Sequence, residues 1–225
     1  MLRKWLINMA TPQNTSSISA KLRKKRFVLF KSLLPKASSP LKILDVGGRE
    51  TIWSREGFCE PNTIDRFQIT ILNIHKEKTT SPNIISVVGD ARNMSEFADG
   101  EFDIVFSNSV IEHVGNYDSQ MQMANEIKRV GKKYFVQTPN LYFPIEPHFL
   151  FPFFQFLPLQ IKVWILTHIP IGRRSKRVPD QEQAIKIANR VKLLSKKEVK
   201  QLFPEATIFE EKFFGLTKSL IAYES

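Results

Sequence analysis

Two histidines, each close to a glutamate, are the residues best suited to acid–base chemistry. His113 directly follows Glu112, and His148 lies two residues after Glu146. Imidazole titrates near neutral pH, so either histidine can act as a general base, with His113 the first choice. The simpler alternatives are that His113 braces a loop and that His148 packs among its aromatic neighbours. The candidate catalytic residues are therefore His113, Glu112 and His148.

The spacing of the histidines and the single cysteine predict no metal site. None of the four histidines has a His-x-x-x-His partner, and Cys59 stands alone. Structural and catalytic zinc sites usually show clustered ligands of this kind. One cysteine also excludes an internal disulfide, which favours a reducing, cytoplasmic compartment. We expect no bound metal.

A second group of polar residues begins in the segment 42–58, KILDVGGRETIWSREGF. An apolar run is interrupted by Asp45 and then reaches Gly47-Gly48. Apolar residues followed by glycines indicate a buried parallel strand that enters a tight turn. Glycine has no Cβ, so a ligand can approach the backbone closely there. Asp45 can hold a ligand's amine or simply order the turn.

Two further predicted strands end in polar residues. The run 84–88 is followed by Gly89-Asp90-Ala91, and the run 102–106 is followed by Ser107-Asn108. In open α/β sheets, ligands bind in a crevice beyond the carboxyl ends of the strands. These polar residues are therefore expected to meet at one edge of a sheet.

These motifs resemble the class I S-adenosylmethionine (SAM)-dependent methyltransferases, in particular the small-molecule group known as type 11. The matching pieces follow the family's order: Ile43-Leu44-Asp45-Val46-Gly47, Gly89-Asp90-Ala91, Phe102-Asp103-Ile104-Val105, Ser109-Val110-Ile111-Glu112-His113-Val114, Glu126-Ile127-Lys128-Arg129-Val130 and Thr138-Pro139-Asn140. The resemblance covers roughly residues 40–140 and continues more loosely toward the C-terminus. It implies a Rossmann-like α/β fold, a mostly parallel seven-stranded sheet with a C-terminal antiparallel hairpin, and SAM as cofactor.

The resemblance also implies a role for each polar residue at the strand ends. Asp45, Gly47 and Gly48 would shape the site for the methionine end of SAM. Asn73 would face the ribose, where the family usually has an acidic residue. The remaining cofactor residues would be Asp90 at the adenine amine, Ala91 beside it, and Asn108 near the reacting methyl through its main chain.

Two positions of the first turn depart from the family's glycine pattern. Arg49 and Thr51 stand where that pattern has its second and third glycines. Arg49 can pair with the carboxylate of SAM, or it can plug the turn.

The remaining pattern predicts the elements that position these residues. A helix is expected at about 19–34, with Lys21, Arg23, Lys24, Lys25 and Arg26 on its solvent side. A helix at about 119–130 takes Asp118 as candidate N-cap, and Ser195 opens a capping box. We expect a basic arm and helix at 1–39 and a methyltransferase domain at 40–225, with an aromatic and proline-rich insertion at about 141–190.

Charge and the insertion suggest classes of partner. The net charge is +11, and residues 1–40 hold nine Lys or Arg and no acid. Such an arm can contact nucleic acid, anionic lipid or an acidic protein, or it can be a solvated helix face.

The insertion has seven aromatic residues between 142 and 156. Its longest charge-free stretch is shorter than the ~20 residues of a spanning helix, so it predicts a lid, a pocket wall or a peripheral membrane contact.

The leading hypothesis is a methyltransferase for a small-molecule, lipid-linked or glycan-linked acceptor. A nucleic-acid (RNA) methyltransferase is an alternative suggested by the basic arm, although the Asn/Asp-Pro-Pro-aromatic motif used for base amines is missing after residue 107. A non-catalytic binding module on the same fold is the third hypothesis, motivated by Arg49, Thr51 and Asn73.

Overall fold

The computed structural model describes residues 18–35, 40–172 and 176–224. Most of the predicted basic arm, residues 1–17, therefore lies outside the described residues. The helices are α2 (Ile18–Leu33), α3 (Glu50–Arg55), α4 (Tyr117–Val130), α5 (Leu159–His168), α6 (Gln181–Asn189) and α7 (Lys196–Leu202), with 3-10 turns η1 (Ile64–Arg66), η2 (Ile111–His113) and η3 (Phe154–Phe156). The large sheet contains β1 (Leu41–Val46), β2 (Phe67–Asn73), β3 (Ile84–Val88), β4 (Ile104–Asn108), β5 (Tyr134–Pro139), β8 (Thr207–Phe213) and β9 (Leu216–Tyr223).

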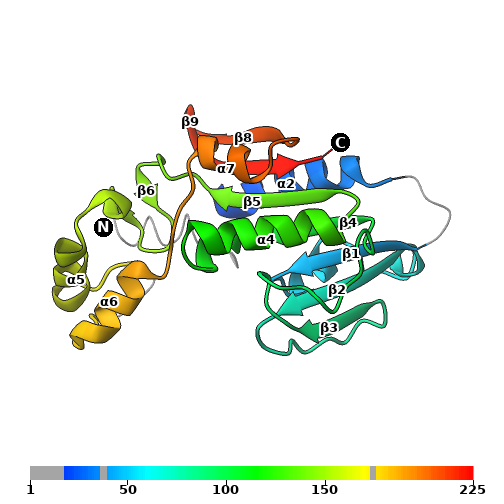
Figure 1. Cartoon of the computed structure of the whole chain (residues 1–225), viewed down its shortest axis with the longest axis horizontal. Helices are drawn as coiled ribbons and strands as arrows, with labels where there is room; N and C mark the ends of the chain where they lie inside the picture. The colour runs from blue at the N-terminus through cyan, green and yellow to red at the C-terminus, as the bar shows by residue number, and fades with distance from the viewer. Residues whose placement is uncertain (1–17, 36–39, 173–175, 225) are drawn as a thin grey trace.

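A seven-stranded sheet forms the centre of the molecule (Figure 1). Its order is β3-β2-β1-β4-β5-β9-β8. The first five strands of this order run parallel, whereas β9 pairs antiparallel with both β5 and β8. The predicted fold class is confirmed, including the C-terminal antiparallel hairpin.

Helices cover both faces of the sheet, which explains why its central strands are mostly apolar and are buried at nearly every position. Every residue of β5 is buried, and in β1 only Lys42 is exposed. Parallel strands covered on both sides need such continuous apolar runs. Phe27 and Phe30 of α2 pack with Trp53 of α3 on one face, while α4 and α7 contribute to a separate core on the other.

Two predicted boundaries are corrected. The fourth strand begins and ends two residues later than the run 102–106, so Asn108 is its last residue. Phe102 makes only an isolated bridge to Gly131, because the chain still follows the preceding turn there. Asn116, rather than Asp118, caps α4 by accepting a hydrogen bond from the backbone N–H of Ser119. The capping box at Ser195 is confirmed.

The prediction for the face of α2 is wrong at one residue. Arg26 was expected on the solvent side, yet only 10% of its side chain is exposed. The two large aromatic residues that follow, Phe27 and Phe30, are buried and turn this face of the helix toward the sheet. Val28, the residue after Phe27, is mostly exposed.

The insertion after β5 has a core of its own. It contains the small sheet β6 (Ile145–Glu146) and β7 (Phe151–Pro152), then η3, α5 and α6. Its buried cluster joins Phe149 and Phe154 to apolar residues of α5 and α6. Figure 1 shows α5 and α6 beyond the end of the sheet, so this part of the insertion is not the expected lid packed on the sheet. Within the described ranges, no helix is long and apolar enough to span a bilayer.

Candidate active site

The Gly47-Gly48 turn rests on the buried carboxylate of Asp45. Trp53 Nε1 donates a hydrogen bond to Asp45 Oδ2 over 2.7 Å, and Asp45 Oδ1 has no hydrogen-bond partner among the described residues. Burial raises the pKa of Asp45 to about 7, although the Trp53 hydrogen bond acts in the opposite direction. A Cβ at Gly48 would lie 1.7 Å from Asp45 Oδ2, so only glycine fits there.

Arg49 does not plug this turn. Its side chain is 73% exposed, and its Nε lies 3.9 Å from Glu77 Oε1. Asn73, at the end of β2, places its Nδ2 3.5 Å from both the Gly48 carbonyl and Glu77 Oε1. Glu77 thus adds a carboxylate beside Asn73. No local motif pointed to it, because it lies in an irregular loop four residues beyond the strand.

The carboxylate of Asp90 is occupied by its own loop. Arg92 donates from Nη2 to Asp90 Oδ2 over 2.6 Å and from its backbone N–H to Oδ1 over 2.9 Å. The hydrogen bond from the Arg92 side chain holds the pKa of Asp90 below its usual value. Both side chains are more than 40% exposed, so the pair is accessible to solvent. Ala91 lies between them and is half-buried.

Asn108 contacts the buried Arg26 of α2. Arg26 Nη1 donates to Asn108 Oδ1 and, over 2.9 Å, to Gln137 Oε1. Its Nη2 pairs with Glu211 Oε2 over 2.8 Å. The side chain of Asn108 is therefore engaged within the protein, which leaves its main chain for the role that the family resemblance implies.

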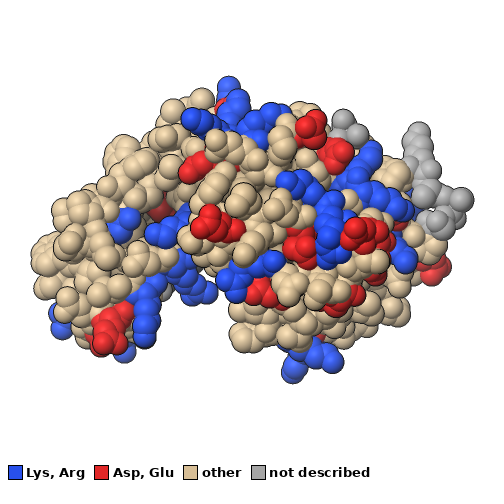
Figure 2. All heavy atoms as spheres, viewed as in Figure 1, with Lys and Arg blue, Asp and Glu red and all other residues tan. Residues whose placement is uncertain are grey.

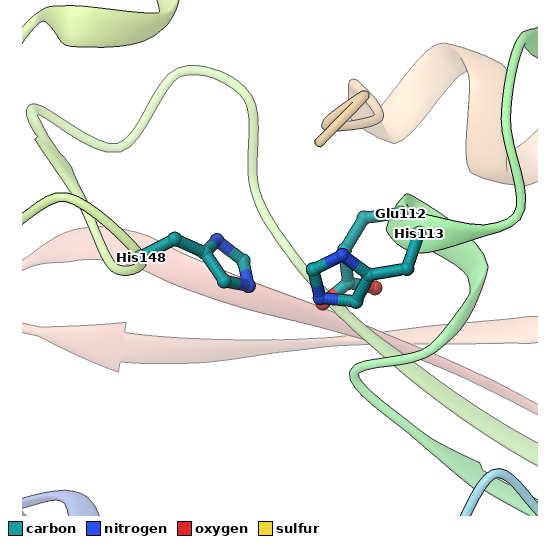
Figure 3. Close-up of side chains that lie close together, drawn as sticks. All are labelled: Glu112, His113 and His148. Atoms are coloured by element: carbon teal, nitrogen blue, oxygen red, sulfur yellow. The ribbon is translucent and has the colours of Figure 1, made fainter. Parts of the chain in front are cut away.

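The three candidate catalytic residues lie together, although 34 residues separate His113 from His148 (Figure 3). One ligand atom from each of Glu112, His113 and His148 lies within 4.8 Å of the other two. The imidazole rings meet edge to face, with centroids 4.7 Å apart. Desolvation of the imidazole, followed by the nearby His148, lowers the pKa of His113 to about 4, although the residue as a whole is exposed.

Glu112 is a fully buried carboxylate with one unused oxygen. Thr138 Oγ1 donates to Glu112 Oε2 over 3.1 Å, whereas Oε1 has no hydrogen-bond partner in the described part of the chain. Burial is the main cause that raises the pKa of Glu112 to about 7. A buried carboxylate with an orphaned oxygen is costly unless a cation or a donor compensates it.

Glu146 orients His148. Glu146 Oε1 lies 2.6 Å from His148 Nδ1, and Glu146 Oε2 accepts hydrogen bonds from the backbone N–H groups of His148 and Phe149. His148 is thus held by a buried glutamate rather than merely packed among aromatics. The proximity of the two residues in sequence was visible, but the role of Glu146 as an orienting group was missed.

The loop after β4 joins this cluster to the glycine turn. Ser109 adopts a φ of +58°, which bends the chain at the end of the strand. Val110 then packs on Gly47, where a Cβ would lie only 2.6 Å from Val110 Cγ2. η2 begins at the next residue and carries Glu112 and His113. The two groups of polar residues therefore belong to one end of the sheet.

A cavity of about 310 Å³ lies on the insertion side of this cluster. Glu146 lines it together with apolar and polar side chains, among them Leu141, Phe149, Phe154, Gln155 and Lys162. Gln155 Oε1 is buried without a hydrogen-bond partner among the described residues. This cavity combines an apolar wall with polar groups that can orient a ligand.

Comparison with known proteins supports the predicted class. A family model described as "Methyltransferase domain" matches residues 48–134. An uncharacterised protein of Mycobacterium tuberculosis is 40% identical over 53 residues, which are 24% of this chain and 18% of that protein. The match thus spans less than a fifth of the length of this curated relative.

Solved structures agree in fold. A SAM-dependent methyltransferase from Methanosarcina mazei superposes with a TM-score of 0.51 and 14% identity, over 87% of this chain and 95% of that one. Phosphoethanolamine N-methyltransferase 2 of Haemonchus contortus, solved with S-adenosyl-L-methionine, gives 0.52 and 12% identity over 93% and 46% of the two chains.

The architecture is that of class I methyltransferases, with a mostly parallel sheet and an antiparallel strand pair at the C-terminus. Residues 48–134 match the family model of the methyltransferase domain, in agreement with the resemblance to the type 11 group.

Proposed function

We propose that this protein transfers a methyl group from SAM to a small-molecule, lipid-linked or glycan-linked acceptor. One observation carries the proposal: the glycine turn over Asp45 and the Glu112–His113–His148 cluster lie at the same end of the sheet, joined through Val110. Donor and acceptor sites must adjoin in this way for an in-line transfer.

The residues around the turn suit a cofactor that carries an amine and a sulfonium. Asp45 offers a buried oxygen without a partner, and Arg49 leaves the turn open to solvent. SAM, when bound, supplies the methyl group. The residues proposed to hold it are Asp45, Gly47, Gly48, Asn73, Asp90, Ala91 and the main chain of Asn108.

The cluster is proposed to face the acceptor. Glu146 fixes the ring of His148, so the imidazole has a defined direction before any substrate binds. Glu112 and His113 approach the same point from η2. Such preorganised polar groups can orient an acceptor atom and exclude competing geometries.

The insertion supports an acceptor with an apolar part. Its cavity has Phe149 and Phe154 in the wall, and aromatic side chains such as Tyr142, Phe153 and Trp164 are more than half exposed. Figure 2 shows few charges on the visible surface over α5. We propose that the domain at 40–225 uses its insertion at about 141–190 to form the acceptor wall and any peripheral membrane contact.

The two alternatives receive less support from the described residues. The plugging role of Arg49, a main motive for a non-catalytic module, is contradicted by its exposure. Arg26, one of the basic residues that suggested nucleic acid, is buried in an ion pair with Glu211.

Calorimetric titration of the full chain with SAM and S-adenosylhomocysteine tests the proposal. We expect saturable binding that Asp45→Asn and Asp90→Asn weaken at least tenfold. Asp65→Asn, a change at an exposed aspartate in η1, is the matched control and should bind as the wild type does. A well-folded wild-type protein that binds neither compound would overturn the proposal. If binding is found, transfer from radiolabelled SAM to lipid, glycan and RNA fractions then identifies the acceptor class.

A further inference from the structure

The Glu112–His113–His148 cluster has the composition of a metal site. Two imidazoles and one carboxylate each offer one ligand atom, and these three atoms lie within 4.8 Å of one another. The two residues of η2 come from the loop after β4, whereas His148 comes from the loop between β6 and β7. The set is therefore assembled by the tertiary fold, which is why residue spacing gave no sign of it.

Each of the three residues also has a contact that orients it. Thr138 holds Glu112 through Oε2, and Glu146 holds His148 through Nδ1. The backbone of Arg190 lies beside the imidazole of His113. Ligating histidines in metalloproteins typically engage their second ring nitrogen with a carboxylate or a backbone carbonyl in this manner.

The unused oxygen of Glu112 is a second, independent sign of a ligand. Glu112 is 0% exposed, and its Oε1 has no hydrogen-bond partner among the residues that the structure describes. A buried oxygen of this kind calls for a cation or a donor. Glu146, also buried, places a second carboxyl group behind His148.

We propose that Glu112, His113 and His148 bind one divalent transition-metal ion, with Glu146 as the positioning residue for His148. Two nitrogens and one oxygen suit Zn²⁺, Fe²⁺ or Co²⁺ rather than Ca²⁺ or Mg²⁺, which prefer oxygen ligands. Three protein ligands leave further coordination positions open. An acceptor hydroxyl can bind there and lose its proton to solvent more readily, a role that rests on the proposed methyl transfer.

Closure around the ion requires a modest rearrangement. Ligand atoms of one tetrahedral Zn²⁺ lie about 3.3 Å apart, given metal–ligand bonds of ~2.0–2.1 Å. The cluster must therefore contract from its present spread of up to 4.8 Å. Only Glu112 is fully buried, and 27% of the His148 side chain is exposed, so rotation of the imidazoles can supply this contraction.

Metal titration of the untagged full chain tests the proposal without reference to SAM. The protein is stripped with chelator, dialysed, and titrated with Zn²⁺ by calorimetry and with Co²⁺ by visible absorbance. We expect one equivalent of each ion and a Co²⁺ spectrum typical of nitrogen coordination. His148→Ala and His113→Ala should each lower affinity at least tenfold, and Glu146→Gln by about 10–100-fold.

His168→Ala is the matched control, because His168 is an exposed histidine of the insertion that stacks on Trp164. It should leave affinity and stoichiometry unchanged. The proposal fails if the wild type binds no ion, if folded His148→Ala binds as tightly as wild type, or if His168→Ala reduces binding equally. If a variant does not fold, the Co²⁺ spectrum of the wild type still tests the proposal, because a spectrum without nitrogen coordination would contradict it. Because metal and SAM are titrated separately, failure of one proposal is distinguishable from failure of the other.

Discussion

Arg26 Nη2 in α2 lies 2.8 Å from Glu211 Oε2 in β8, and the two side chains are only 10% and 6% exposed. The same guanidinium donates hydrogen bonds to Asn108 in β4 and Gln137 in β5. One buried cation thus connects α2 to three strands of the sheet beside the candidate site.

Arg26→Met should destabilise the fold by about 3–5 kcal/mol, since it leaves the carboxylate of Glu211 buried without its partner. Lys25→Met, at an exposed position of the same helix, should change stability by no more than about 0.5 kcal/mol. Urea denaturation measures both free energies of unfolding. Adding Glu211→Gln to Arg26→Met should recover part of the loss. A loss below about 1 kcal/mol in the single variant would show that the pair is not structurally important.

The raised pKa of Asp45 makes stability depend on pH. The folded pKa, about 7, lies above the ordinary value of 3.8, so the folded state binds the proton more tightly than the unfolded state. Stability supplied by this proton is present below pH ~4 and is lost as pH rises toward 7.

Asp45→Asn should remove this pH dependence, because the amide oxygen can still accept the Trp53 hydrogen bond without carrying charge. We expect the variant to be more stable than wild type by a few kcal/mol at pH 8 and similar to it near pH 4. Thermal or urea unfolding from pH 4 to 8 measures the difference. The prediction would be contradicted if the stabilities of the two proteins varied with pH in the same way.

Substitutions at Gly47 and Gly215 can distinguish the cost of backbone strain from the cost of a steric clash. Both have positive φ, +76° and +79°, but a Cβ at Gly47 would meet Val110, whereas nothing lies within 4 Å at Gly215. Gly215→Ala should cost about 1–2 kcal/mol from strain alone. Gly47→Ala should cost more and weaken SAM binding. Adding Val110→Ala to Gly47→Ala should recover the stability lost beyond the cost of strain. Equal losses of stability from the two glycine substitutions would argue against the clash.

Arg92→Ala tests whether the Asp90 carboxylate is available to a cofactor. Both side chains of the pair are partly exposed, so stability should change by less than about 0.5 kcal/mol. SAM affinity should stay the same or rise, since the carboxylate is released, whereas Asp90→Asn should lower it. If calorimetry instead finds that Arg92→Ala weakens binding as much as Asp90→Asn, the guanidinium itself takes part in the site.

Local sequence predicted the elements well, because their signals depend on neighbours along the chain. The run 84–88 matches β3 residue for residue, and the Ser195 capping box opens α7 as expected. Gly47-Gly48 marked the turn because positive φ and the close approach of Asp45 exclude a side chain. Asp45, Asp90 and Asn108 followed from the rule for open α/β sheets, whereas Asn73 followed from the family resemblance.

Tertiary structure alone decided which charged and titratable groups meet. Arg26 is the last of four consecutive basic residues in the helix, and nothing local distinguishes it from Lys25. Its burial depends on Glu211, 185 residues away. His113 and His148 likewise meet only because the loop after β4 and the loop between β6 and β7 approach the same end of the sheet.

Sequence by itself determined the strands, the turn and the class of fold, since these arise from short-range patterns. The fold decided the ion pair and the Glu112–His113–His148 cluster, since electrostatic and coordination contacts depend on distances in space that periodicity does not encode.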